Sequence, residues 1–178
     1  PIRDDMYRDG VSIYIGIPFC PSRCLYCSFV TNGTKQAAAL MPEYIEALKK
    51  EIKYTADIIS HNGTPVETVY IGGGTPTTLT PQLLEEMIDC LYDSCDLSKM
   101  KEFTVEAGRP DTITEEKLKV LKKYNVDRIS INPQSMNDST LKIIGRAHSA
   151  DDIREAMKMA RHCGFCLLYT CPSPRDYA

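Results

Sequence analysis

The chain has 178 residues, of which 43% are hydrophobic and 25% are charged, and its formal net charge is −3. This composition is typical of a globular domain with a sizeable core, and the interspersed acids and bases give no indication of a nucleic-acid partner or an anionic membrane surface. No apolar run approaches the ~20 residues of a membrane span, and no signal peptide opens the chain.

A cysteine triplet follows the first predicted strand. Residues 1–10 are polar and lead into residues 11–17, an apolar run that predicts a buried strand. Cys20, Cys24 and Cys27 come next at C-x3-C-x2-C spacing, on the loop at the carboxyl end of that strand. The chain has eight cysteines, but so tight a triplet in an ordinary composition indicates a metal centre in a reducing, cytoplasmic compartment rather than a disulfide framework.

Three thiolates on one short loop can hold a soft metal centre, which means zinc, Cu(I) or an iron–sulfur cluster. A structural zinc normally takes four protein ligands, and no fourth cysteine or histidine follows within the usual distance. A [4Fe–4S] cluster held by only three cysteines keeps one iron open for a ligand that is not part of the protein. The spacing therefore favours an iron–sulfur cluster and leaves zinc as the alternative.

The rest of the chain alternates short apolar runs with amphipathic segments. Strands are predicted at residues 67–71, 102–107, 127–132 and 165–170. Helices are predicted from residue 42 to about residue 60 and after the N-caps Thr80, Thr114 and Ser149. This alternation predicts an α/β fold of right-handed βαβ units around a parallel sheet, whose ligands bind at the carboxyl ends of the strands.

Chemically unusual residues do follow the predicted strands. The run Gly72, Gly73 and Gly74 comes after the second strand, and backbone without side chains can approach a ligand closely. No Gly-Lys-Ser/Thr follows, so this run is not a phosphate loop. Glu106 ends the third predicted strand and Gln134 follows the fourth. The sequence therefore predicts a ligand site around the cysteine loop.

The chain resembles the radical S-adenosylmethionine (radical SAM) superfamily, and within it the oxygen-independent coproporphyrinogen III oxidase family, closest to its coproporphyrinogen dehydrogenase branch. Five motifs in the same order carry the resemblance, which covers roughly residues 11–165. They are Tyr14-Ile-Gly-Ile-Pro-Phe-Cys20 with its continuation Cys20-x3-Cys24-Leu-Tyr26-Cys27, Gly72-Gly-Gly-Thr-Pro76, Val105-Glu-Ala-Gly-Arg-Pro110, Ser130-Ile-Asn-Pro-Gln134 and Ile144-Gly-Arg-Ala-His148.

The resemblance implies the first four to five βα units of an incomplete (β/α)6-type parallel barrel. Residues 11–165 would form the N-terminal part of this radical SAM core domain. Residues 166–178, which are interrupted by prolines, are expected to be a non-native or truncated tail. Because the chain begins at Pro1 rather than at a methionine, we expect it to be a fragment of a longer protein.

The resemblance also assigns roles to residues. It implies that Cys20, Cys24 and Cys27 hold three irons of a [4Fe–4S] cluster and that the amino and carboxylate groups of SAM bind the fourth iron. It implies that SAM is contacted by Tyr14, Gly72, Gly73, Gly74, Thr75, Glu106, Gln134 and Arg146. Arg109 and His148 are candidates either for the same pocket or for the protein surface.

The function implied by the resemblance is that of an oxidoreductase of haem biosynthesis. It would convert the propionate side chains of coproporphyrinogen III into the vinyl groups of protoporphyrinogen IX without oxygen, with this tetrapyrrole and a reducing electron donor as partners. Established catalytic members often carry another cysteine two residues after the triplet, where this chain has Phe29. Haem-chaperone relatives also lack that cysteine, so a haem-binding chaperone without decarboxylase activity is the alternative. A zinc-stabilised α/β domain is a third possibility.

Overall fold

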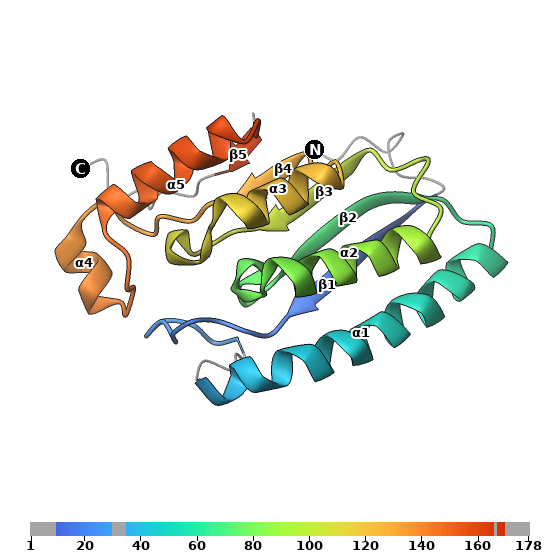
Figure 1. Cartoon of the computed structure of the whole chain (residues 1–178), viewed down its shortest axis with the longest axis horizontal. Coiled ribbons are helices and arrows are strands. Elements are labelled where there is room, and N and C mark those ends of the chain that lie inside the picture. Colours follow the sequence, from blue (N-terminus) through green and yellow to red (C-terminus); the bar gives the residue numbers. More distant parts are fainter. Residues whose placement is uncertain (1–9, 30–34, 166, 170–178) are drawn as a thin grey trace.

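The computed structural model describes residues 10–29, 35–165 and 167–169. Strands and helices alternate along the chain (Figure 1). The elements are β1 (Val11–Ile17), α1 (Lys35–His61), β2 (Val66–Gly73), η1 (Pro76–Thr78), α2 (Pro81–Ser94), β3 (Glu102–Glu106), η2 (Pro110–Thr112), α3 (Glu115–Lys123), β4 (Arg128–Ser130), α4 (Asp138–Ile143), α5 (Ala150–His162) and β5 (Leu167–Tyr169).

The five strands form one parallel sheet in the order β1-β2-β3-β4-β5, which confirms the predicted α/β fold. In the register of this sheet Ile15 lies beside Ile71, Ile71 beside Val105, and Val105 beside Ile129. Figure 1 shows α1, α2 and α3 packed side by side along one face. All strands point the same way, so their carboxyl ends meet at one edge of the sheet.

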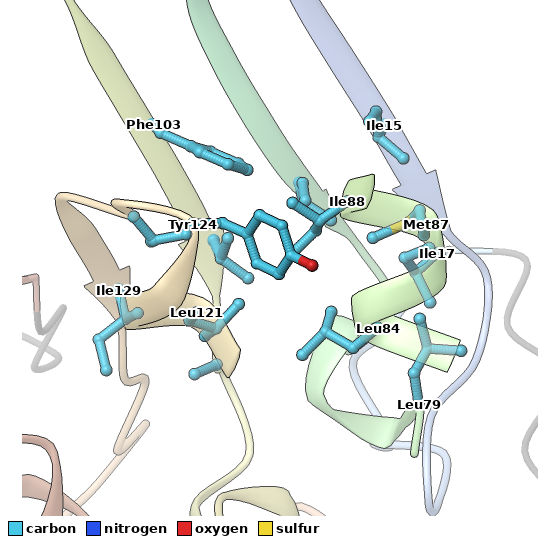
Figure 2. Close-up of a cluster of buried hydrophobic side chains, with 14 of the residues drawn as sticks. Ile15, Ile17, Leu79, Leu84, Met87, Ile88, Phe103, Leu121, Tyr124 and Ile129 are labelled. Atoms are coloured by element: carbon cyan, nitrogen blue, oxygen red, sulfur yellow. The ribbon is translucent and has the colours of Figure 1, made fainter. Parts of the chain in front are cut away.

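The core lies between the sheet and the helices. Successive residues of a strand face opposite sides, so Ile15 and Ile17 are buried against the helices, whereas Tyr14, the residue before Ile15, is 62% exposed. The buried side chains gathered in Figure 2 include Ile15, Ile17, Leu84, Met87, Ile88, Phe103, Leu121 and Ile129. The opposite face of the strands is therefore free to carry polar side chains towards the site.

The predicted caps begin three of the helices. The hydroxyl of Thr80 accepts a hydrogen bond from the backbone N–H of Leu83, and Thr114 does the same for Lys117. Ser149 and Asp152 form a capping box at the start of α5, each side chain accepting from the other residue's backbone. These caps satisfy backbone donors that have no partner within the helix.

The prediction that the first helix begins at Pro42 is wrong. Helix α1 begins at Lys35, and Pro42 lies inside it. The segment before Pro42 contains Ala37, Ala38 and Ala39, and alanine has the strongest helix propensity. A proline in the second or third turn removes one hydrogen bond, which the remaining helix tolerates. The short helix α4 was not predicted, and β2 continues through Gly73 instead of ending at Ile71.

The end of the chain is only partly described. Leu167–Tyr169 pairs with β4 as the last strand of the sheet. The remainder of the predicted tail, residue 166 and residues 170–178, lies outside the described residues, as do residues 1–9. None of the helices that the structure describes is long and apolar enough to cross a membrane.

Candidate functional site

The carboxyl ends of the strands enclose a pocket of about 220 Å³. It is lined by Tyr14, Cys20, Cys24, Tyr26, Cys27, Phe29, Gly73, Gly74, Thr75, Glu106, Gly108, Arg109, Asn132, Gln134 and Arg146. These residues come from β1, β2 and β3, from the loops that follow β1 to β4, and, for Arg146, from the loop after α4. Of the predicted cluster and SAM ligands, only Gly72 does not line this pocket.

The three cysteines lie on the loop after β1, and none of them is in a disulfide. Cys24 is buried, whereas Cys20 and Cys27 are partly exposed. The backbone N–H of Cys27 donates to the carbonyl of Cys24 over 3.1 Å, so the last two cysteines share a tight turn. Burial raises the pKa of the Cys20 thiol, and this effect outweighs the opposing hydrogen bond with Thr75.

The cysteine loop is fastened to the glycine run after β2. The N–H of Gly74 donates to the carbonyl of Ile17 over 2.7 Å, and the N–H of Thr75 donates to the carbonyl of Phe19 over 2.8 Å. A Cβ atom on Gly74 would lie 2.7 Å from the carbonyl oxygen of Phe19 and 3.1 Å from Sγ of Cys20. Gly74 is therefore required by the close approach of the cysteine loop itself.

Gly72 has a different role in the packing. It is buried in β2, and a Cβ atom there would lie 2.7 Å from the ring of Tyr70 and 3.1 Å from the carboxylate of Glu106. The missing side chain makes room for a hydrogen bond of 2.6 Å that the Tyr70 hydroxyl donates to Oε1 of Glu106. The ring of Tyr70 is in turn stacked on that of Tyr14, with centroids 5.8 Å apart. The Tyr14 ring and the Glu106 carboxylate are thus both supported by Tyr70.

Arg146 reaches the pocket from the loop after α4. One of its terminal nitrogens donates to the carbonyl of Gly108 and the other to the hydroxyl of Tyr26, each over 2.9 Å. Its buried Nε has no hydrogen-bond partner among the described residues. Gln134, on the loop after β4, has a φ of +66°. Residues other than glycine rarely adopt this backbone conformation, and those that do are often found at functional sites.

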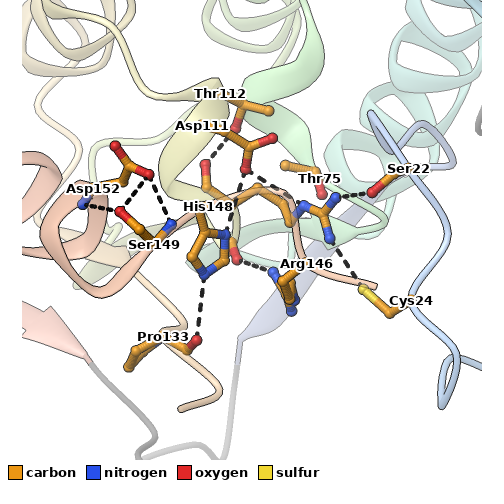
Figure 3. A network of polar contacts seen from close by, with 12 residues as sticks. Ser22, Cys24, Thr75, Asp111, Thr112, Pro133, Arg146, His148, Ser149 and Asp152 are labelled. Atoms are coloured by element: carbon orange, nitrogen blue, oxygen red, sulfur yellow. Dashed lines mark hydrogen bonds and ion pairs between the residues drawn. The ribbon is translucent and has the colours of Figure 1, made fainter. Parts of the chain in front are cut away.

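Arg109 and His148, which the sequence left between pocket and surface, are both buried. Figure 3 shows His148 with the Asp111 side chain beside it. Arg109 donates a hydrogen bond to Sγ of Cys24 and ion-pairs with Asp111, whose Oδ1 also lies 3.7 Å from Nδ1 of His148. Burial acts to raise the pKa of Asp111, but His148 and Arg109 outweigh it and lower that pKa below its ordinary value. Only Arg109 of the two lines the pocket.

A comparison with known families identifies the fold. The sequence model of the Radical SAM superfamily matches residues 14–172. The chain belongs to the radical SAM superfamily. Membership of the superfamily confirms the expected cofactors, because radical SAM proteins use a [4Fe–4S] cluster and S-adenosylmethionine.

The relatives of this radical SAM chain handle tetrapyrroles according to their names. It is 47% identical over 167 residues to the oxygen-independent coproporphyrinogen-III oxidase-like protein HemZ of Bacillus subtilis (strain 168), covering 90% of the chain and 32% of that relative. It is 41% identical to the heme chaperone HemW of the same organism, covering 86% of the chain and 40% of the relative. The chain thus spans about a third of the length of the first relative and two fifths of the second.

A solved structure extends the likeness to three dimensions. Coproporphyrinogen III oxidase (HemN) from Escherichia coli, a radical SAM enzyme, superposes with a TM-score of 0.82 at 25% identity, over 92% of this chain and 37% of that one. This match confirms that the parallel sheet is part of a radical SAM barrel. The chain is therefore a radical SAM chain of the type represented by HemZ, HemW and HemN.

The donor set of the pocket fits the cofactors of the superfamily. Three free thiols face the same cavity as the carboxylate of Glu106 and the guanidinium of Arg146, and a buried Arg146 Nε is left to pair. Within the described ranges, no three His, Cys, Asp or Glu side chains converge as ligands of a single metal ion would. A cluster makes a different demand, because each cysteine binds its own iron. The thiols would hold the irons, and the acidic and basic groups would contact SAM.

Sequence reasoning missed Tyr70 and Asp111. Tyr70 lies on β2 beside Tyr14 on β1 in the register of the sheet. Its alternation with Ile71 placed it on the polar face of the strand, and that was the only available signal. Asp111 lies in η2, whose position could not be read from periodicity.

Proposed function

We propose that this chain forms the radical-generating core of an enzyme that oxidatively decarboxylates coproporphyrinogen III to protoporphyrinogen IX without oxygen. The observation that carries the proposal is the single pocket shared by three free thiols, Glu106 and Arg146 at the carboxyl edge of the sheet. The substrate class is supported by the 47% identity to a coproporphyrinogen-III oxidase-like protein. A cytoplasmic location and a reducing electron donor belong to the same proposal.

Each side of the pocket has a proposed task. Cys20, Cys24 and Cys27 hold the cluster, and when bound, the cluster and SAM supply a radical that removes a hydrogen atom. SAM is contacted by Tyr14, Gly73, Gly74, Thr75, Glu106, Gln134 and Arg146. Gly72 acts indirectly, by leaving room for the Tyr70–Glu106 hydrogen bond. The Arg146 guanidinium suits a carboxylate, because its planar fork can donate two parallel hydrogen bonds.

The overall change at each propionate side chain is simple. The side chain loses one hydrogen atom, then carbon dioxide and one electron, and becomes a vinyl group. One electron from a reductant is consumed for each SAM that is cleaved to methionine and 5′-deoxyadenosine, and the electron lost by the substrate passes to a one-electron acceptor. The role of this chain is to place SAM and to exclude side reactions, since the cofactors carry the chemistry.

The test uses the protein made from the complete reading frame that contains this chain. It is incubated without oxygen with SAM, a reductant, a one-electron acceptor and coproporphyrinogen III, and the porphyrinogens are separated by chromatography. We expect protoporphyrinogen IX together with methionine and 5′-deoxyadenosine. Cleavage of SAM while coproporphyrinogen III is unchanged would remove this assignment.

A second candidate, a haem chaperone of the same fold, is supported by Phe29. This residue lines the pocket and is 65% exposed at the position where catalytic family members often have a cysteine. The 41% identity to the heme chaperone HemW points the same way. Binding of one haem per chain and its transfer to an acceptor protein, with no decarboxylation, would establish this function instead.

A further inference from the structure

Arg109 is the feature of the site that the proposed function does not explain. It follows β3 and is only 2% exposed, although a guanidinium is charged at every physiological pH. Taking a charge out of water is strongly unfavourable unless the charge finds close partners. The partners of this cation therefore indicate what it does.

Two of its partners belong to the cysteine loop. Nη1 donates to Sγ of Cys24 over 3.1 Å, and Nη2 donates to the hydroxyl of Ser22. Figure 3 labels both of these partners. The third contact is weaker, because Nε lies 3.6 Å from Oδ1 of Asp111 and has no hydrogen-bond partner among the described residues. Most of the buried charge is thus directed at the loop and only partly balanced by Asp111.

A thiol sulfur is a weak hydrogen-bond acceptor, so a neutral Cys24 would compensate a buried cation poorly. A thiolate bound to iron carries negative charge and compensates it well. The contact therefore suits the metal-bound state of Cys24 better than the free thiol. Hydrogen bonds to the sulfurs, net charge and solvent exposure set the reduction potential of iron–sulfur clusters, and a cation next to a ligand sulfur stabilises the extra electron of the reduced form.

We propose that Arg109 is a positioning residue of the iron–sulfur centre: its buried guanidinium orients Sγ of Cys24 and raises the reduction potential of the cluster bound there. The inference rests on cluster binding by Cys20, Cys24 and Cys27, and not on the identity of the substrate. The ion pair with Asp111 helps to hold the Arg109 side chain in place, and the negative charge of Asp111 partly offsets the effect of the guanidinium on the cluster.

The test compares Arg109→Gln and Arg109→Lys with Arg23→Gln in the reconstituted complete protein. Arg23 is the matched control, because it neighbours Cys24 in sequence but is exposed, so water screens its charge. Iron and sulfide are measured first, and the midpoint potential then comes from a redox titration followed by electron paramagnetic resonance. For Arg109→Gln we expect about a tenfold smaller equilibrium constant for one-electron reduction, a shift of about 59 mV to more negative potential. Arg109→Lys should shift less, and Arg23→Gln should not shift.

Each outcome is decisive. A loaded Arg109→Gln variant with the wild-type potential would overturn the inference. If Arg109→Gln binds no cluster, the thermal unfolding temperatures of the cluster-free proteins are compared. The inference is supported if cluster-free Arg109→Gln is as stable as the cluster-free wild type and Arg109→Lys binds the cluster again. If both variants lose the cluster and are also less stable than the wild type in the cluster-free state, Arg109 only stabilises the fold, and the inference is overturned. Absence of iron and sulfide from the wild-type protein would instead refute cluster binding by the cysteines.

Discussion

The hydroxyl of Tyr70 donates a 2.6 Å hydrogen bond to Oε1 of Glu106, across the neighbouring strands β2 and β3. Burial, reinforced by the hydrogen bond and the charge of Glu106, raises the pKa of Tyr70 far above its ordinary value. The phenol therefore remains a donor at every physiological pH. Because the ring of Tyr70 also stacks on Tyr14, one side chain supports two proposed SAM contacts.

Replacing Tyr70 with phenylalanine keeps the stacking on Tyr14 and removes the hydrogen bond to Glu106. We expect SAM to bind roughly tenfold more weakly, because a hydrogen bond to a charged group contributes about 1.5–3 kcal/mol. Isothermal titration with SAM in the loaded protein measures this. Tyr92→Phe is the control, since its hydroxyl donates to the carbonyl of Tyr124 away from the pocket. An unchanged SAM affinity in Tyr70→Phe would show that Glu106 needs no support.

Substituting alanine at Gly74 should destabilise the protein by about 1–3 kcal/mol, since the new Cβ meets backbone oxygens that cannot swing away. The measurement is denaturant unfolding of the cluster-free protein. Gly16→Ala is the matched control: its Cβ would meet only the Tyr14 ring, at an ordinary 3.6 Å. Equal effects of the two substitutions would contradict the close approach of the cysteine loop to Gly74.

Replacing any one of Cys20, Cys24 and Cys27 with alanine should abolish cluster binding, because each thiolate binds its own iron and no spare thiolate is expected in the pocket. Wild-type protein reconstituted without oxygen should contain about four irons and four sulfides per chain. Cys163→Ala, at the end of α5 and outside the pocket, should retain both. Stoichiometric zinc without sulfide in the wild-type protein would decide for the zinc-stabilised domain.

Asp111 should make stability depend on pH below neutrality. Its pKa is lowered in the folded state, so its contribution is complete above about pH 4, the ordinary pKa range of an unfolded aspartate, and is lost as the pH falls through the lower folded value. We expect the free energy of unfolding of the cluster-free wild type to exceed that of Asp111→Asn by about 1–3 kcal/mol at pH 7, because the variant leaves the buried guanidinium of Arg109 less compensated.

Denaturant unfolding at pH 7, 5 and 3 follows this difference between wild type and Asp111→Asn, which should shrink only at the lowest pH. Asp151→Asn is the control, since Asp151 pairs with Arg154 on the exposed surface of α5. A difference that is constant over the three pH values would mean that Asp111 acts through packing and not through its charge.

Much of the architecture could be predicted from local patterns. The caps at Thr80, Thr114 and Ser149 begin helices as expected, because capping depends on residues within one turn. The strand-end position of the cysteines, Glu106 and Gln134 also followed from the sequence, because parallel strands bring their carboxyl ends to one edge. The first residue of α1 could not be predicted from the sequence. Proline is favoured at the first position of a helix but is also tolerated inside it, so Pro42 was compatible with both positions.

Side-chain burial was the main property that local patterns could not supply. Arg109 and His148 lie in loops, where periodicity carries no information, and the sequence left both between pocket and surface. Whether such a residue is buried depends on which segments fold over it. Here Ser22 and Cys24 of the cysteine loop accept hydrogen bonds from Arg109, and Asp111 lies between Arg109 and His148.

The sequence by itself determined the kind of site, a soft metal centre held by three thiolates, because three thiols within eight residues remain close together in any compact fold of that loop. Through their periodicity it also determined the alternation of strands and helices, apart from the short helix α4. Only the tertiary structure decided which cation meets which thiol. Arg109 and Cys24 are 85 residues apart in the chain, and they touch because the sheet places the ends of β1 and β3 on either side of β2. No local pattern encodes that contact, since it exists only when all three strands are in register.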